Sequence, residues 1–202
     1  LHRPRSGGRR RPDLRHQVNL CTSNYETARL ALRLAAPSLA PAAADYHRRN
    51  RAFFAPFDPV REESFFTEAG QRALLEEEAA RARGDRSYRF YLSLREEPER
   101  IIGLAGLNDL VRGAFQSCFL SYKLDMDLCG RGYMTEAVEE LVRIAFGELG
   151  LHRIEANIMP RNKASLRVAE KAGFYNEGLA LKYLRIHGVW EDHIHMVLRS
   201  DC

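Results

Sequence analysis

The sequence predicts a mixed α/β domain, and three observations support this fold class. Residues 88–124 contain three consecutive strand-like segments joined by short turns, which is typical of an antiparallel meander. Residues 134–158 then combine a helix pattern with a strand pattern, which favours a strand–helix–strand unit. A length of 202 residues suits one domain, because division would leave each half with a thin core.

The N-terminal part is expected to form one strand and two helices. Residues 27–34 alternate leucine with arginine or alanine, which predicts a strand. Residues 41–50 are expected to form a short helix, whereas two prolines in the aromatic segment 52–64 favour a loop. Residues 66–83 follow a helix pattern that ends at Gly84.

The meander follows this helix. Residues 88–95 alternate in polarity, and residues 96–100 are expected to form a turn. Residues 101–110 and 115–124 are the next two expected strands, joined through a turn that contains Gly113.

The next expected elements alternate between helix and strand. Residues 134–149 place their apolar side chains on one stripe, which predicts an amphipathic helix, and Gly150 follows as its cap. Residues 153–158 predict a strand, and residues 162–172 predict a helix that closes at Gly173.

Residues 174–186 and 193–198 are the last two expected strands. A meander followed by a βαβ unit predicts a mixed sheet with helices on both faces.

The positive charge is concentrated at the N-terminus. Residues 1–16 contain six arginines and one aspartate, a net charge of +5, so the other 186 residues carry −1 and the whole chain +4. We expect residues 1–20 to be a disordered basic tail and residues 21–202 to form the single domain. The near-neutral body makes direct nucleic-acid binding an unfavoured interpretation. No apolar run has the length of a membrane span, and the four widely spaced cysteines favour a reducing, cytoplasmic setting.

A glycine-containing segment at residues 128–137 is the first candidate binding site. Gly130 and Gly132 allow sharp backbone bends, and the helix behind them offers free N–H groups with a positive dipole end. Together with Arg131 they predict an anion site. A tight strand-to-helix turn is the structural alternative. Thr135 occupies the third glycine position of a dinucleotide fingerprint, which argues against that motif.

Residues 153–178 form the second candidate segment. Asn157 lies on the polar face of its expected strand, while Asn162 and Ser165 share a face on the first turn of the next helix. The alternative interpretation makes Asn162 the N-cap of that helix, with Ser165 at its third position. His193 and His195 share one strand face, and without a third ligand we interpret them as structural residues and predict no metal site.

The two segments together resemble the GNAT acyl-CoA N-acyltransferases. Residues 129–134 occupy the position of the family's pyrophosphate loop, Q/R-x-x-G-x-G/A. The closer resemblance is to the RimJ/RimL-type ribosomal-protein N-terminal acetyltransferases, with RimJ nearest. It includes, in order, residues 57–64 (FDPVREES), 130–137 (GRGYMTEA), 160–163 (PRNK) and 188–193 (GVWEDH).

The resemblance implies a mostly antiparallel sheet that opens in a V, with acetyl-CoA as cosubstrate in the split. The pyrophosphate would contact the backbone of Gly130, Arg131, Gly132, Tyr133, Met134 and Thr135. The pantetheine and thioester would lie against the backbone of Leu124 and Asp125. Asn157, Asn162 and Ser165 would line the pantetheine arm. Ser165 would also be the catalytic acid that protonates the leaving thiolate.

Four positions depart from the family pattern. Cys129 replaces the first Gln or Arg of the loop, and Ala169 occupies the position of a tyrosine that serves as acid in many members. Leu184 and Phe119 stand where some relatives have a glutamate, so a general base is missing. A helix N-terminus lowers thiol pKa values, so Cys129 could be a reactive thiol, but this interpretation is not favoured.

The missing general base affects which kind of amine can serve as acceptor. A protein α-amine has a pKa of roughly 7.7–8.0 and a lysine amine one of about 10.4, so near neutral pH far more of the α-amine is already neutral. We therefore expect acetyl transfer to the N-terminal α-amine of a protein, by resemblance a ribosomal protein, from an enzyme that is a monomer or homodimer.

Three alternatives stay open. The enzyme could acetylate a small-molecule amine, the protein could bind acyl-CoA without turnover, or the arginine-rich tail could bind nucleic acid.

Overall fold

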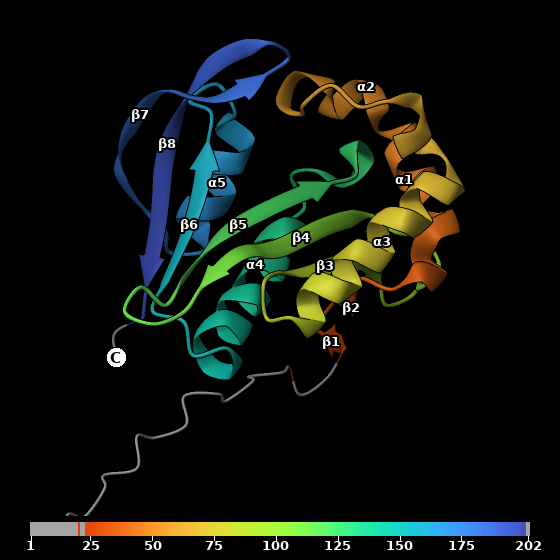
Figure 1. Cartoon of the computed structure of the whole chain (residues 1–202), viewed down its shortest axis with the longest axis horizontal. Coiled ribbons are helices and arrows are strands. Elements are labelled where there is room, and N and C mark those ends of the chain that lie inside the picture. The colour runs from red at the N-terminus through yellow and green to blue at the C-terminus, as the bar shows by residue number, and fades with distance from the viewer. Residues whose placement is uncertain (1–19, 21–22, 201–202) are drawn as a thin grey trace, which may run out of the picture.

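The computed structural model describes Leu20 and residues 23–200, so the expected tail lies almost wholly outside the described residues. One eight-stranded sheet has the order β1-β2-β3-β4-β5-β6-β8-β7, with only β5 and β6 parallel (Figure 1). The strands are β1 (Asn24–Glu26), β2 (Leu30–Leu34), β3 (Tyr88–Leu94), β4 (Gly103–Val111), β5 (Ser117–Leu124), β6 (Arg153–Ile158), β7 (Tyr175–Ile186) and β8 (Val189–Arg199).

Five α-helices accompany the sheet in the described part of the chain. They are α1 (Ala40–Arg49), α2 (Arg51–Phe54), α3 (Glu68–Arg83), α4 (Tyr133–Arg143) and α5 (Lys163–Lys171). Short 3-10 turns occur at Pro37–Leu39, Ala55–Phe57, Glu63–Phe66 and Met126–Leu128, and α4 continues into a π-helical turn at Ile144–Glu148. Within the residues described, no helix has the length and apolar character needed to cross a bilayer.

The predicted mixed α/β class is confirmed, and so is the predicted element order with two additions. The sequence pattern does not predict strand β1. This strand has only three residues and one buried side chain, Tyr25, so no alternation can be recognised in it. The expected loop at residues 52–64 overlaps α2, because Phe54 packs in the core and completes a helical turn before the prolines. Strand β8 also begins at Val189, four residues before the predicted start.

The two faces of the sheet have separate helical layers. One layer consists of α4 and α5, whose buried residues, such as Leu141 and Leu166, join the larger core cluster. The other layer consists of α1 and α3, which pack residues such as Tyr46 and Leu75 against Tyr91 of β3. The predicted arrangement of helices on both faces is therefore correct (Figure 1).

The sheet opens between β5 and β6. These strands pair only at Ser117–Phe119, opposite Arg153–Glu155, and then diverge. All six residues of β6 pair with β8 along the other edge, so β6, β8 and β7 separate from the N-terminal five strands as a unit. The V-shaped split that the resemblance implied is therefore present (Figure 1).

The apolar stripe of α4 predicts a large effect of truncation. Leu141 is fully buried against the sheet, so Leu141→Ala should lower the free energy of unfolding by about 2–5 kcal/mol through lost burial and a residual cavity. Urea denaturation monitored by circular dichroism measures this. The matched control is Leu181→Ala, whose side chain is 71% exposed, and it should change stability by at most about 0.5 kcal/mol. Equal effects of both variants would contradict the assigned packing.

Candidate active site

The split presents backbone groups of β5 that no longer pair with a strand. The Asp125 amide donates to the Ile102 carbonyl at 2.7 Å, on the side of β4. Because alternate residues of a strand direct their backbone groups to opposite sides, Leu124 and Tyr122 direct theirs toward β6. Since β6 has already diverged there, the Leu124 amide faces the split, whereas the Asp125 amide is committed to the sheet.

The side chain of Asp125 anchors the end of β5. It is buried and receives hydrogen bonds from Arg49 at 2.9 and 3.0 Å and from Arg100 at 3.2 Å. Arg49 also bonds the carbonyl of Ile101. Two arginines compensate the desolvation of one carboxylate, so Asp125 positions the strand end that borders the split.

The glycine loop adopts the conformation that its composition predicts. Gly130 and Gly132 have φ angles of 79° and 82°, in the left-handed region that favours glycine. An added Cβ would meet nothing within 4 Å at Gly130, so the loop surface is open there. Gly132 is the N-cap of α4 and provides no side-chain cap, which leaves the first N–H groups of the helix available.

The predicted loop residues lie together at this helix start. Gly130, Arg131 and Gly132 are exposed, Tyr133 and Thr135 are half-buried, and Met134 is buried, so Met134 offers only its backbone. The open N–H groups, the helix dipole and Arg131 make this surface suitable for the pyrophosphate of CoA.

Arg29, at the start of β2, clamps the loop from outside. Its Nη1 donates to the Arg131 carbonyl at 3.0 Å, its Nε pairs with Glu136 at 2.7 Å, and its guanidinium lies 4.4 Å from the Tyr133 ring centroid. Burial raises the pKa of Glu136, but hydrogen bonds from Thr27 and Arg29 outweigh this and leave the pKa below its usual value. No sequence signal identified this clamp, because its partners lie more than 100 residues away.

The start of α5 confirms the N-cap interpretation of Asn162. Its Oδ1 accepts a hydrogen bond from the Ser165 amide at 3.1 Å. The carbonyl of Ser165 accepts from Tyr122 Oη at 2.8 Å, so a β5 side chain connects to α5 on one face of the split. Burial raises the pKa of Tyr122 to about 12. Ser165 is thus held through its backbone while its half-buried hydroxyl is not part of either bond.

Asn157 belongs to the opposite face of the sheet. It lines a cavity of about 760 Å³, whereas its neighbours Ala156 and Ile158 join the core under α4 and α5. The structure therefore separates Asn157 from Asn162 and Ser165, which the sequence analysis grouped on one pantetheine arm.

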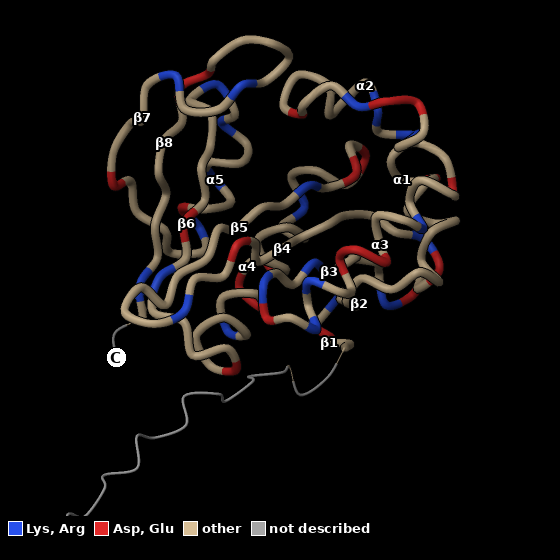
Figure 2. Tube along the Cα trace, in the orientation of Figure 1, with Lys and Arg blue, Asp and Glu red and all other residues tan. Residues whose placement is uncertain are grey.

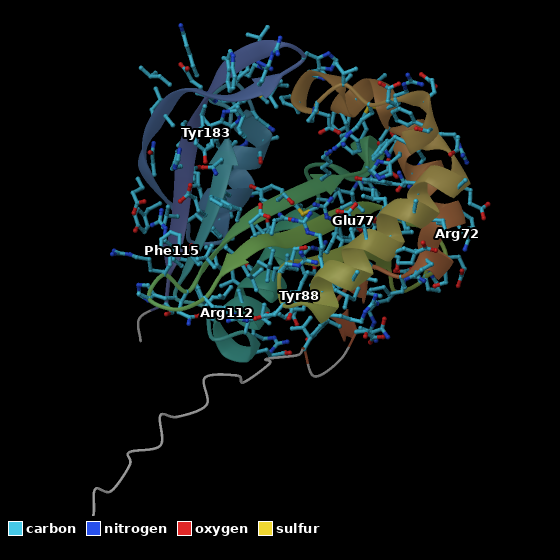
Figure 3. All side chains as sticks on the ribbon, in the orientation of Figure 1. Arg72, Glu77, Tyr88, Arg112, Phe115 and Tyr183 are labelled. Atoms are coloured by element: carbon cyan, nitrogen blue, oxygen red, sulfur yellow. The ribbon has the colours of Figure 1, made fainter. Side chains whose placement is uncertain are left out.

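The cavity lies beside the split, between the α1/α3 layer and the C-terminal strands. Its walls come from α3, β3, β4, β5, β6 and β7, including Glu77 and Tyr183, both labelled in Figure 3. Phe119 and Leu184 also line it, so the two positions where relatives have a glutamate do face this cavity. An acceptor molecule in the cavity would reach the split from the side opposite α4 and α5.

Buried charges shape the cavity. Burial raises the pKa of Glu78, which accepts a hydrogen bond from Tyr91 at 2.9 Å and lies 3.3 Å from Arg89. Burial lowers the pKa of Lys123, although its ion pair with Asp58 opposes this shift. These charges are therefore paired within the protein.

His47 completes this wall. Burial and the nearby Lys123 lower its pKa to about 3, so it is neutral at physiological pH.

The surroundings of two other positions do not favour a catalytic role. Ala169, at the position of the family's acidic tyrosine, is fully buried in the core. The Cys129 thiol has a raised pKa, because of desolvation and the nearby Asp125, which is the reverse of the lowering that a helix N-terminus would produce. Among the described residues no group of three or more His, Cys, Asp or Glu could hold a metal ion.

Comparison with known proteins defines the class. The family model of the acetyltransferase (GNAT) domain matches residues 29–175, so the chain belongs to the GNAT acetyltransferase family. Members of this family use acetyl-CoA, and solved structures with this fold include complexes with CoA and with acetyl-CoA. The open glycine loop and the split are consistent with that cosubstrate.

Individual relatives narrow the class. The chain is 47% identical over 144 residues to the probable N-acetyltransferase YjcK of Bacillus subtilis, covering 71% of this chain and 79% of the relative. It is 38% identical over 180 residues to the ribosomal protein uS5-alanine N-acetyltransferase of Escherichia coli, covering 89% and 92%. The crystal structure of the ribosomal-protein-S5-alanine acetyltransferase of Vibrio fischeri matches with a TM-score of 0.84 and 34% identity, covering 88% and 97%. The chain is thus an acetyltransferase of the RimJ/RimL type.

The clamp predicts a specific binding defect. Arg29→Ala removes the bond to the loop carbonyl and the contact with Tyr133, so the Kd for acetyl-CoA should rise about tenfold, or ~1.4 kcal/mol. Isothermal titration calorimetry measures this. Arg95→Ala is the matched control, because Arg95 contacts Glu26 and the Thr27 carbonyl but not the loop, and its Kd should stay within about twofold. An unchanged Kd in Arg29→Ala would refute the loop as the pyrophosphate site.

Proposed function

We propose that the protein transfers the acetyl group of acetyl-CoA to the N-terminal α-amine of a protein, with a ribosomal protein as the favoured acceptor. The single observation that carries this is the cavity of about 760 Å³ beside the split, on the face away from α4 and α5. A peptide end entering there would approach the split without crossing the pyrophosphate loop. The similarity to the uS5-alanine enzymes over most of the chain supports the same acceptor class.

Two apolar side chains of the cavity, at positions where some relatives have a glutamate, favour an α-amine over a lysine amine. Phe119 and Leu184 supply no carboxylate, so the wall positions that hold a glutamate in some relatives cannot remove a proton. The pKa of a lysine amine lies about three units above neutral pH, so its deprotonation needs a base, whereas an α-amine is already partly neutral there. An acceptor in the cytoplasm, where ribosomes work, fits this proposal.

The proposed reaction is direct. The neutral amine attacks the thioester carbonyl carbon, and the Leu124 amide, which faces the split, stabilises the negative oxygen that develops. The C–S bond then breaks while the nitrogen releases one proton to solvent water. The thiolate takes a proton from a water or from the Ser165 hydroxyl, which then regains one from solvent. The helix start at Gly132 would hold the pyrophosphate, while the backbone of β5 would pair with the pantetheine.

The acceptor proposal predicts a preference among amines. With labelled acetyl-CoA, a peptide that begins with alanine should gain label on its α-amine, with kcat/KM at least about tenfold above that of small amines, because it fills the cavity. Mass spectrometry locates the label and thiol release gives the rate. An N-terminally blocked peptide with an internal lysine is the matched control. A preference for a small amine would support acetylation of a small molecule instead. Binding of acetyl-CoA without turnover on any amine would indicate a non-catalytic protein.

The acid role of Ser165 predicts a turnover defect. Ser165→Ala should lower kcat on the order of 100-fold, because the thiolate loses its proton donor, while the backbone bonds to Asn162 and Tyr122 remain. Ser165→Thr retains a hydroxyl and should keep most of the activity. Steady-state kinetics at saturating acetyl-CoA measure both. Unchanged kcat in Ser165→Ala would exclude the acid role and leave water as the donor.

A further inference from the structure

Charged side chains line the cavity beside the split and a smaller neighbouring cavity of about 130 Å³. All but one of these aspartates, glutamates, lysines and arginines form ion pairs inside the protein. The pairs are Glu78–Arg89, Arg81–Glu77, Arg81–Asp109, Lys123–Asp58 and Arg51–Glu63. Arg61 is the exception. It is exposed and lines both cavities, yet within residues 23–200 it has no ion pair and no hydrogen bond.

The segment that carries Arg61 is anchored close to the split. Asp58, three residues before Arg61, pairs with Lys123 of β5. The Pro56 carbonyl accepts a hydrogen bond from Arg161 at 2.9 Å, which connects the same segment to the turn after β6. Contacts with strands on both sides of the split therefore hold the backbone that presents Arg61 to the cavity.

The guanidinium of Arg61 stacks on an aromatic ring. Its Cζ lies 4.8 Å from the centroid of the Phe65 ring, and Phe65 in turn contacts the His47 ring at 4.6 Å. Stacking occupies one face of the planar guanidinium and leaves the N–H groups at its edge free to donate. Phe65 thus orients a group that can bind a carboxylate through two parallel hydrogen bonds.

The charge of Arg61 acts on the neighbouring titratable groups. Burial lowers the pKa of Lys123, Asp58 opposes this, and Arg61 adds to the lowering. Burial, followed by the cations Lys123 and Arg61, lowers the pKa of His47 to about 3. Positive charge is therefore in excess here, and an anion in the cavity would offset it. Lys123 directly precedes Leu124, whose amide faces the split, so the excess lies near the proposed reaction centre.

We propose that Arg61 selects acceptors that carry an aspartate or glutamate shortly after the N-terminal residue. The carboxylate would accept hydrogen bonds from the guanidinium while the α-amine reaches the split. Such an acceptor supplies the partner that Arg61 lacks, whereas a lysine or arginine at the same position would be repelled. The proposal rests on the proposed transfer to a protein α-amine, and it names the acceptor sequence that the cavity prefers.

A peptide scan tests this preference. Peptides of equal length begin with alanine and carry one glutamate at position 2, 3, 4 or 5, and each has a partner with glutamine at that position. An extended chain advances about 3.3 Å per residue, so these positions sample roughly 3–13 Å beyond the first residue. At the best position, kcat/KM for the glutamate peptide should exceed that for its glutamine partner about tenfold. The gain should appear mainly as a lower KM, because the contact is made on binding.

Variants of Arg61 should change this ratio. Arg61→Gln should reduce it to within about twofold of one, and Arg61→Glu should reverse it in favour of a peptide with arginine at that position. Arg72→Gln is the matched control, because it removes the same charge from an exposed arginine that pairs with Glu68 on α3 and lines neither cavity (Figure 3). This control should keep the ratio within about twofold of that of the unmodified enzyme. The Kd for acetyl-CoA should stay unchanged in all three variants.

The outcomes separate this inference from the proposed function. Equal kcat/KM for glutamate and glutamine peptides at all four positions, or a preference that persists in Arg61→Gln, would overturn the inference and leave the proposed function intact. If no alanine peptide is acetylated, the proposed function fails and the inference fails with it.

Free alanine tests a small molecule as the source of the carboxylate. Its kcat/KM should be at least about tenfold below that of the best glutamate peptide, because it cannot place its amine in the split and its carboxylate on Arg61 together. A higher value that is lost in Arg61→Gln would assign Arg61 to a small-molecule acceptor and overturn the inference.

Discussion

The parting of β5 from β6 is the constraint on which the rest of the structure depends. Three residue pairs join the strands, and beyond them the β5 backbone faces a gap because β6 diverges from β5 while it stays paired with β8. Unpaired backbone groups in a protein interior are costly, so the gap is suited to a ligand that supplies the missing partners. The glycine loop follows β5 along the chain, and α5 follows β6, so both proposed ends of the cosubstrate site start from this point.

Charged side chains maintain the geometry on both sides of the gap. Arg29 connects the start of β2 to the loop carbonyl and to Glu136, while Arg49 and Arg100 converge on Asp125 at the end of β5. Acidic and basic residues are accordingly interspersed along the described chain (Figure 2). Positive charge in this part of the protein serves mainly internal contacts, which agrees with a near-neutral body.

The proposed reaction uses both faces of the sheet. Ser165 lies on the face of α4 and α5, where it would return a proton to sulfur, and its backbone is tied to Tyr122 across the split. The cavity lies on the other face, where an acceptor would enter. An acid on one face and an acceptor on the other fit a single attack at a thioester that lies between them.

The sequence by itself determined the element order, the glycine loop and the cap at Asn162, because each depends on residues close together in the chain. Alternation, helical spacing and left-handed glycines are local properties, and they were predicted correctly apart from the short elements β1 and α2. Only the tertiary structure decided that Asn157 faces the cavity rather than α5, and that Glu155 reaches His195 forty residues later. Strand register and the divergence of β5 from β6 determine these placements. Register depends on packing of the whole sheet, which no local pattern in the sequence encodes.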